Sequence, residues 1–99
     1  MQYKVIIADS AKDVFCRFDG RWRSALKEAM RQFLEHEPKK ESRSRIKRLR
    51  GMRRPQYRLR VGNMRVFYDV NDAMQQVEIL GFALKPRAEK WLEQHGAPE

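Results

Sequence analysis

Four short stretches of the chain alternate apolar and polar residues, or are rich in β-branched and aromatic residues, which is typical of strands. These stretches are Gln2–Ala8, Tyr57–Val61, Met64–Val70 and Gln76–Phe82. Gly62-Asn63 forms a two-residue turn between the second and third stretches, and Asn71-Asp72-Ala73 separates the third from the fourth. The pattern therefore predicts one strand near the start of the chain and three consecutive antiparallel strands later in it.

Two helices are expected between the first and second strands. A short helix runs from Ser10 to about Arg17 and is followed by the helix-breaking pair Asp19-Gly20. A longer helix runs from Arg21 to about Glu37, where apolar residues recur at helical spacing. These apolar residues are Trp22, Leu26, Ala29, Met30, Phe33 and Leu34. We expect the whole stripe, including both aromatic residues, to belong to the core.

Two further segments complete the predicted order of elements. Residues 39–56 are polar and basic, with Ile46 and Leu49 as the only large aliphatic anchors, so we expect a loop. Pro86 to about Gln94 predicts a terminal helix with proline in its first turn. The order β-α-α-β-β-β-α predicts an α+β fold with an antiparallel sheet packed against helices. A length of 99 residues fits a single domain spanning residues 1–99.

The two-residue turn determines which residues of the predicted hairpin face each other. Counting outward from the turn places Arg60 opposite Arg65 and Arg58 opposite Phe67. Side chains alternate between the two faces along a strand, so Arg58, Arg60, Arg65 and Phe67 share one face. The other face is apolar and is expected to meet the helices; it carries Tyr57, Leu59, Val61, Met64, Val66 and Tyr68.

The formal net charge of +9 is concentrated in one segment. Between Lys39 and Arg65, twelve Lys or Arg residues stand against one acid, Glu41, whereas the rest of the chain has ten basic and twelve acidic residues. Such a segment indicates a binding site for a polyanion such as nucleic acid. The residues expected to contact RNA are Lys47, Arg48, Arg50, Arg53, Arg54 and, by stacking on a base, Phe67.

The facing arginines of the hairpin support the same interpretation. Like charges directly opposite each other destabilise a sheet by roughly 0.2–1 kcal/mol per pair. A phosphate held between the guanidinium groups would remove this repulsion, because its oxygens suit bidentate arginine geometry. The alternative is a set of solvated arginines whose charge is relieved by Asp69 or Glu78.

Several classes of protein are disfavoured by composition. No apolar run approaches the roughly 20 residues of a membrane span, and the first residues lack the apolar region of a secretory signal. One cysteine, Cys16, allows neither an intrachain disulfide nor a cysteine cluster for zinc. Cys16 lies among apolar residues, so we expect a buried thiol. These features suit the cytoplasm, with no metal and no cofactor expected.

Several segments resemble the RelE/ParE toxin superfamily, most sharply between Leu49 and Trp91. They are Leu49-Arg50-Gly51-Met52, Tyr57-Arg58-Leu59-Arg60, Met64-Arg65-Val66-Phe67-Tyr68-Asp69-Val70 and the closing segment Ile79–Trp91. The resemblance implies a RelE-like mRNA interferase of a type II toxin–antitoxin system, held inactive by a cognate antitoxin. RelE-type toxins enter the ribosomal A site and cut mRNA by attack of a 2′-hydroxyl on the adjacent phosphate.

Such chemistry needs a proton acceptor, cations for the phosphorane charge, a donor for the leaving oxygen and a ring that stacks on a base. By position, the resemblance assigns these catalytic roles to Arg58, Arg60, Arg65, Lys85, Arg87 and Trp91. RelE has lysines where this chain has Arg58 and Arg60, and a tyrosine where it has Trp91. Arginine is a poor general base because it stays protonated.

Neither histidine supplies the missing base on spacing alone. His36 is expected to be solvated at the end of the long helix, and His95 to lie in a tail that frays. Two other functions therefore stay open. One is a ParE-like DNA gyrase inhibitor without nuclease chemistry, and the other is a non-catalytic nucleic-acid-binding module.

Overall fold

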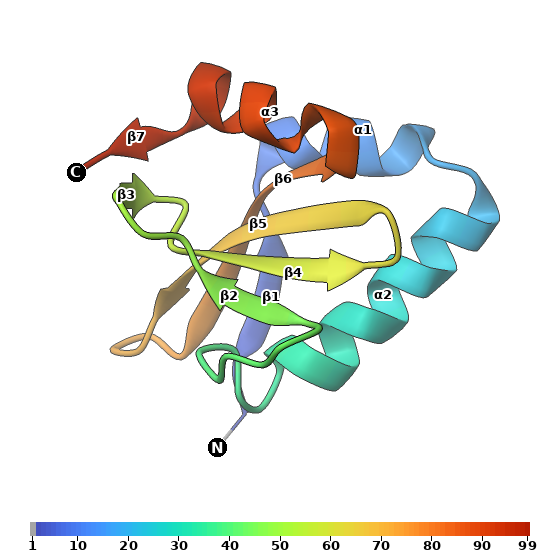
Figure 1. Ribbon diagram of the computed structural model, residues 1–99. Coiled ribbons are helices and arrows are strands. Elements are labelled where there is room, and N and C mark those ends of the chain that lie inside the picture. The colour runs from blue at the N-terminus through green and yellow to red at the C-terminus, as the bar shows by residue number, and fades with distance from the viewer. Residues whose placement is uncertain (1) are drawn as a thin grey trace.

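A computed structural model describes residues 2–99 (Figure 1). In chain order the elements are β1 (Lys4–Ile7), α1 (Asp9–Arg17), α2 (Gly20–Leu34), β2 (Ile46–Arg48), β3 (Met52–Arg54), β4 (Tyr57–Val61), β5 (Met64–Asn71), β6 (Gln76–Leu84), a 3₁₀ turn (Lys85–Arg87), α3 (Ala88–His95) and β7 (Ala97–Pro98). The fold is α+β, as the sequence predicts, and all seven predicted elements are present with ends shifted by a few residues.

Five strands form the main sheet in the order β1-β6-β5-β4-β2. The pairs β6–β5 and β5–β4 are antiparallel, as expected, and β4 also pairs antiparallel with β2, whereas β1 pairs with β6 in parallel. The predicted antiparallel sheet therefore contains one parallel pair, at β1. Apolar alternation reports which face of a strand is buried; it carries no information on the strand's neighbour or direction.

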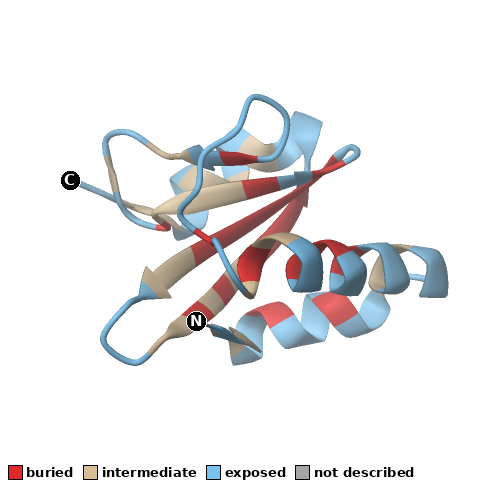
Figure 2. Cartoon of the chain, turned by 90° about the horizontal axis from the view of Figure 1, so that it is seen from below, coloured by how far each residue is buried: buried red, intermediate tan, exposed pale blue. Residues whose placement is uncertain are grey.

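Helices α1 and α2 pack on one face of the sheet and enclose the core with it (Figure 2). The apolar face of the hairpin lies in this core, as predicted; Leu59, Val66 and Tyr68 have no exposed surface. Trp22 and Phe33 are partly buried and pack against the same cluster. The buried Tyr68 hydroxyl donates to the carbonyl oxygen of Pro38 at 2.7 Å, and burial raises the pKa of Tyr68.

The two helices differ from prediction at their ends and in one side chain. α1 begins at Asp9, and α2 begins at Gly20 after Asp19, whose carboxylate accepts from the Trp22 amide at 3.0 Å. Cys16 is exposed, which corrects the expectation of a buried thiol. α1 turns Ala11 and Phe15 inward, and the residue after Phe15 lies about 100° further round the helix, away from the sheet.

The basic segment predicted as a loop contains two short strands. β2 pairs with β4 and forms one edge of the main sheet, with Ile46 buried in the core. β3 pairs with β7 in a separate two-stranded sheet. Three-residue strands of mostly basic residues give no alternating pattern, so their pairing depends on neighbours that are distant in sequence.

Candidate nucleic-acid interface

The hairpin β4–β5 has the register expected from its turn. Arg60 faces Arg65, and Arg58 faces Phe67. Gly62 has a φ of +58°, the left-handed conformation that glycine adopts readily in a two-residue hairpin turn. The neighbouring strands extend these pairs across the face that points away from α1 and α2. One row contains Lys47, Arg58, Phe67 and Gly81, and the next contains Arg60, Arg65 and Ala83.

The three arginines of the hairpin lie near one another, but they are not equally exposed. Arg60 is exposed and Arg58 half-buried, whereas Arg65 is only 7% exposed. Arg65 Nη1 donates to the carbonyl oxygens of Gly62 at 2.9 Å and Met64 at 3.3 Å. Burial, and then the charges of Arg58 and Arg60, lower the pKa of Arg65. Arg65 is therefore not one of the solvated arginines of the alternative interpretation, although it lies on the predicted face.

The acidic residues of this face do not neutralise the arginines. Asp69 and Glu78 are paired across β5 and β6, and both form ion pairs with Arg54, at 3.6 and 3.1 Å. Asp69 also accepts from the Gln56 amide at 2.7 Å, and its burial raises its pKa. Within residues 2–99, no carboxylate lies within 4.0 Å of Arg58, Arg60 or Arg65.

Helix α3 covers the part of the arginine-bearing face that Phe67 and Gly81 form on β5 and β6. Phe67 points to this face, as expected, but it is 1% exposed because the Trp91 ring stacks on it, with centroids 4.6 Å apart and planes at 10°. A base cannot stack on Phe67 in this arrangement, which corrects that expectation. His95 is the last residue of α3, and its ring lies 5.0 Å from that of Trp91, so it is not in a free tail.

Gly81 is the residue of this arrangement that sequence reasoning missed. A Cβ atom at Gly81 would lie 2.0 Å from Trp91 Cζ2, so only glycine lets the indole rest on β6. An isolated glycine inside a strand is a signal of close approach by another group. That signal was available in the sequence.

The six residues expected to contact RNA fall into three groups. Lys47, Arg50 and Arg53 are exposed and make no ion pair or side-chain hydrogen bond within residues 2–99. Arg54 is held by two carboxylates, and Phe67 is covered. Arg48 Nη1 donates at 2.8 Å to the carbonyl oxygens of both Leu49 and Gln56. Arg48 therefore holds the 49–56 loop together.

Lys85 and Arg87 belong to the 3₁₀ turn that joins β6 to α3. The Lys85 amide donates to the carbonyl oxygen of Asn63 at 2.7 Å, which fixes this turn beside the tip of the hairpin. Both side chains are exposed. Neither makes an ion pair in the described part of the chain.

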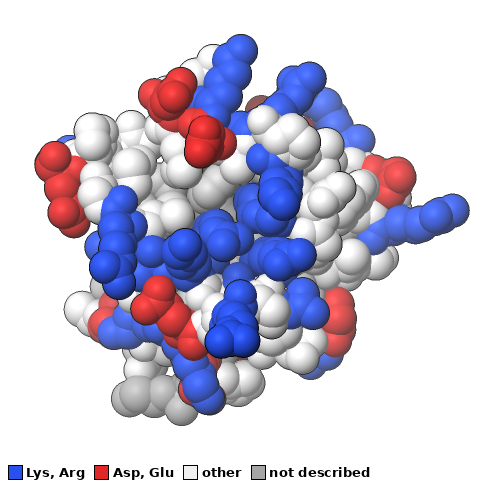
Figure 3. Space-filling view, in the orientation of Figure 1, with Lys and Arg blue, Asp and Glu red and all other residues white. Residues whose placement is uncertain are grey.

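Lys and Arg side chains gather across the middle of the face shown in Figure 3, where β2 and β4 are nearest the viewer in Figure 1. The described residues contain no group of three or more His, Cys, Asp or Glu side chains suited to hold a metal ion. None of the helices formed by residues 2–99 has the length and apolar character of a membrane span. Positive charge therefore dominates the face shown in Figure 3.

No protein-family model and no curated protein matches the sequence. Among solved structures, RelE in the archaeal RelE–RelB complex of Pyrococcus horikoshii is 27% identical, with a TM-score of 0.70 over 88% of this chain and 99% of that one. The toxin–antitoxin complex RelBE2 of Mycobacterium tuberculosis gives 24% identity and a TM-score of 0.68 over 85% and 99%.

A mutant of the E. coli toxin RelE in the free state gives a TM-score of 0.72 at 22% identity, over 96% of this chain and 95% of that one. The likeness therefore extends over nearly the whole of both chains. The chain has the RelE-like toxin fold.

Proposed function

We propose that this protein is the toxin of a type II toxin–antitoxin system and acts as a ribosome-dependent endoribonuclease on mRNA in the cytoplasm. One observation carries the proposal. Arg58, Arg60 and Arg65 lie close together, and no carboxylate of residues 2–99 lies within 4.0 Å of them. An uncompensated arginine group is costly to the fold and suits a phosphate. The RelE-like fold supports the toxin role.

In the proposed reaction the 2′-hydroxyl oxygen bonds to the adjacent phosphorus and the bond from phosphorus to the 5′-oxygen breaks. The products are a 2′,3′-cyclic phosphate and a 5′-hydroxyl. Arg58, Arg60 and Arg65 would stabilise the negative charge on the oxygens of the five-coordinate phosphorus, because their hydrogen-bond donors are already in place before the reaction. The ammonium of Lys85, with Arg87 as its alternative, would donate a proton to the leaving oxygen.

The proton of the attacking hydroxyl needs an acceptor outside the arginine group. Arginine stays protonated at neutral pH, and no histidine or carboxylate contacts these three side chains within residues 2–99. We therefore propose that the acceptor is water or a ribosomal group in the A site. The chain would contribute charge stabilisation and positioning, which accounts for dependence on the ribosome.

Trp91 supplies the aromatic surface of the proposed site. Its indole is half-buried on Phe67, and α3 contacts the rest of the chain through few apolar residues, none of them fully buried. A base of the bound mRNA would stack on the exposed part of the indole. Lys47, Arg50 and Arg53 would hold the phosphates on either side of the cleavage point.

The test is induction of the wild type and of the double variant Arg60→Ala/Arg65→Ala, with growth and mRNA integrity followed together. The wild type should arrest growth and cut mRNA in a translating extract, and the variant should do neither. Lys27→Ala/Arg31→Ala removes the same charge from an exposed part of α2 and should behave as the wild type. Intact mRNA in an extract whose ribosomes the wild type occupies would refute the nuclease.

A ParE-like DNA gyrase inhibitor is the second candidate. The absence of any proton acceptor among the arginines favours it, because inhibition by binding needs no base. A supercoiling assay with purified gyrase separates the two candidates. A non-catalytic nucleic-acid-binding module would bind RNA with a steep dependence on salt but would cause neither growth arrest nor loss of supercoiling.

An antitoxin is the expected partner. The similar structures from P. horikoshii and M. tuberculosis are complexes of a toxin with its antitoxin. We propose that an antitoxin covers the basic face of this chain, because an acidic segment would remove the repulsion within the arginine group. The proposal predicts that a small open reading frame adjoins the gene and that its co-expression restores growth.

A further inference from the structure

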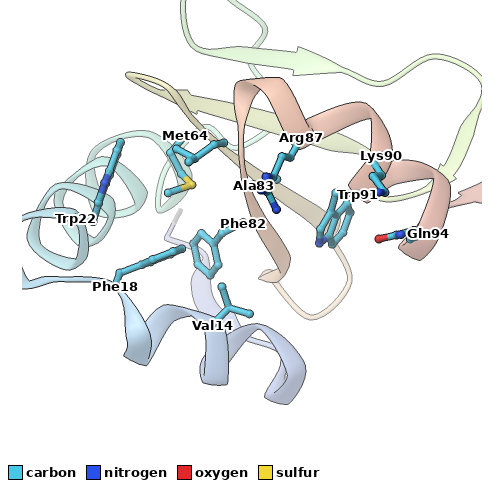
Figure 4. A pocket seen from close by; sticks show the side chains of 11 residues that line it. Val14, Phe18, Trp22, Met64, Phe82, Ala83, Arg87, Lys90, Trp91 and Gln94 are labelled. Atoms are coloured by element: carbon cyan, nitrogen blue, oxygen red, sulfur yellow. The ribbon is translucent and has the colours of Figure 1, made fainter.

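Different elements border the arginine group on its two sides. On the side of α3, Arg87 and Trp91 line a hollow of about 670 Å³, which is part of the site described above (Figure 4). On the other side, β2 forms the edge of the main sheet and pairs with β4. Arg45 directly precedes β2 and lies outside the set of residues assigned to the site.

The Arg45 side chain takes the place of a main-chain donor between β2 and β4. The Arg60 amide donates to the carbonyl oxygen of Arg45 at 2.9 Å, as in an antiparallel pair. The Arg45 amide does not return this hydrogen bond, because it donates to Ser42 Oγ at 3.1 Å. The carbonyl oxygen of Arg60 accepts instead from Arg45 Nη1 at 3.2 Å. The guanidinium group therefore pairs a carbonyl group that the sheet edge would otherwise leave to water.

The ring of Phe33 holds the same guanidinium group from the side of the helices. Arg45 Cζ lies 5.1 Å from the centroid of this ring, a distance typical of a cation–π contact. Phe33 belongs to α2 and packs against the core. No carboxylate of residues 2–99 lies within 4.0 Å of Arg45. Arg45 is thus a connection between α2 and the main chain of β4 at Arg60.

We propose that Arg45 is a positioning residue for Arg60; its effect on cleavage rests on the proposed function. Arg60 is exposed near the end of β4, and its neighbour β2 is a strand of only three residues. Arg45 ties this part of β4 to α2 and so fixes the main chain from which the Arg60 guanidinium reaches the phosphate. A shift of about 1 Å at a catalytic group can cost about 10²-fold in rate.

The test compares Arg45→Met with Arg43→Met in the whole chain. Both substitutions remove one positive charge from the same exposed segment, but Arg43 makes no ion pair or side-chain hydrogen bond within residues 2–99. Both variants should weaken RNA binding by a similar small factor, because this affinity follows the total charge. Only Arg45→Met should lower the rate of mRNA cleavage on translating ribosomes at saturating protein, by about tenfold.

Hydrogen exchange at the Arg60 amide tests the positioning without reference to cleavage. In Arg45→Met this amide should exchange at least about fivefold faster, because the end of β4 opens more often without its connection to α2. In Arg43→Met it should exchange at the wild-type rate. The amide of Val66, a buried residue of β5, should be unaffected in both variants, which would show that the opening is local.

Phe33 offers variants that keep every charge. Phe33→Leu removes the ring beside the guanidinium group and should reproduce part of both effects, about threefold each. Phe33→Tyr keeps the ring and should behave as the wild type. In the double variant, the effects of Phe33→Leu and Arg45→Met should not add, because both substitutions break the same contact.

Unchanged exchange of the Arg60 amide in Arg45→Met would overturn the proposal, as would equal loss of cleavage in Arg43→Met. A loss of cleavage that disappears at saturating protein would make Arg45 an RNA ligand and would also overturn it. Wild-type protein that cuts no mRNA would refute the proposed function alone, since exchange at Arg60 still decides whether Arg45 fixes β4. The two failures are therefore distinguishable.

Discussion

Trp91 packs against Gly81 so closely that its Cζ2, Cε2 and Nε1 atoms leave no room for a Cβ atom there. The same indole stacks on the ring of Phe67, which pairs with Gly81 across β5 and β6, so the two contacts hold α3 against the sheet. The far end of the closing segment is held by the pairing of β7 with β3. The covering of Phe67 thus depends on a residue with no side chain.

Gly81→Ala should displace Trp91 and destabilise the chain. The new methyl group would overlap the indole, which is rigid and cannot move without losing its contact with Phe67. Overpacking of this kind costs about 1–3 kcal/mol. Urea unfolding measures the loss, and the near-UV circular dichroism of the indole should weaken at the same time. Gly20→Ala is the control, because a Cβ there meets nothing within 4 Å, and it should neither lower the free energy of unfolding nor weaken the indole signal.

Arg60→Gln should stabilise the fold and weaken RNA binding. Arg60 faces Arg65 across the hairpin, so its removal relieves a like-charge pair worth roughly 0.2–1 kcal/mol. The gain should disappear in about 1 M salt, where the screening length is about 3 Å. Arg53→Gln is the control: Arg53 is exposed and faces no arginine, so it should lower RNA affinity without raising stability. A loss of stability in Arg60→Gln would refute the repulsion.

Arg48 and Lys47 are neighbours on β2 with opposite expected effects. Arg48→Ala should destabilise the chain by about 1–3 kcal/mol, because it removes a charged donor from the carbonyl groups of Leu49 and Gln56. Lys47→Ala should change stability little, since Lys47 is exposed, but should weaken RNA binding and reduce its dependence on salt. Urea unfolding tests the effect on stability, and RNA titration at two salt concentrations tests the effect on binding. Equal effects of the two variants would contradict a structural role for Arg48 and a binding role for Lys47.

The hairpin was predictable from the sequence because its information is local. Glycine in a two-residue turn fixes the register, and the register fixes which residues share a face. The placement of Arg58 with Arg60 and Arg65 followed from this alone and is confirmed. The exposure of each side chain was not predictable, because burial of Arg65 depends on its bonds to the turn and on the surrounding chain.

Contacts between distant segments account for the errors. Phe67 is covered because α3 packs back over the sheet and places Trp91 on it. The residue patterns of β5 and α3, taken separately, do not predict that the two elements are in contact. The roles of Arg48 and Arg54 depended in the same way on partners elsewhere in the fold. Charge density alone cannot distinguish an arginine that holds a loop from one that is free to bind a phosphate.

Asp72 should make stability depend on pH at both ends of the range. The Asp72 carboxylate accepts a hydrogen bond from the Tyr3 hydroxyl at 2.7 Å and forms an ion pair with Lys39. The hydrogen bond from Lys39, and then that from Tyr3, lower the pKa of Asp72. Asp72 in turn raises the pKa of Lys39. A lowered carboxyl pKa contributes stability above the ordinary value of 3.8 and loses it as pH falls further. A raised lysine pKa contributes stability below pH 10.5, and this stability is lost as pH rises through the higher pKa of the folded state.

Asp72→Asn should therefore lower the Tm most at neutral pH, with the difference from the wild type shrinking in acid and in strong alkali. Asp13→Asn, at an exposed carboxylate without an ion pair or hydrogen bond within residues 2–99, should follow the wild-type profile. A difference that stays constant from acid to alkali would mean that the cluster acts through packing rather than charge.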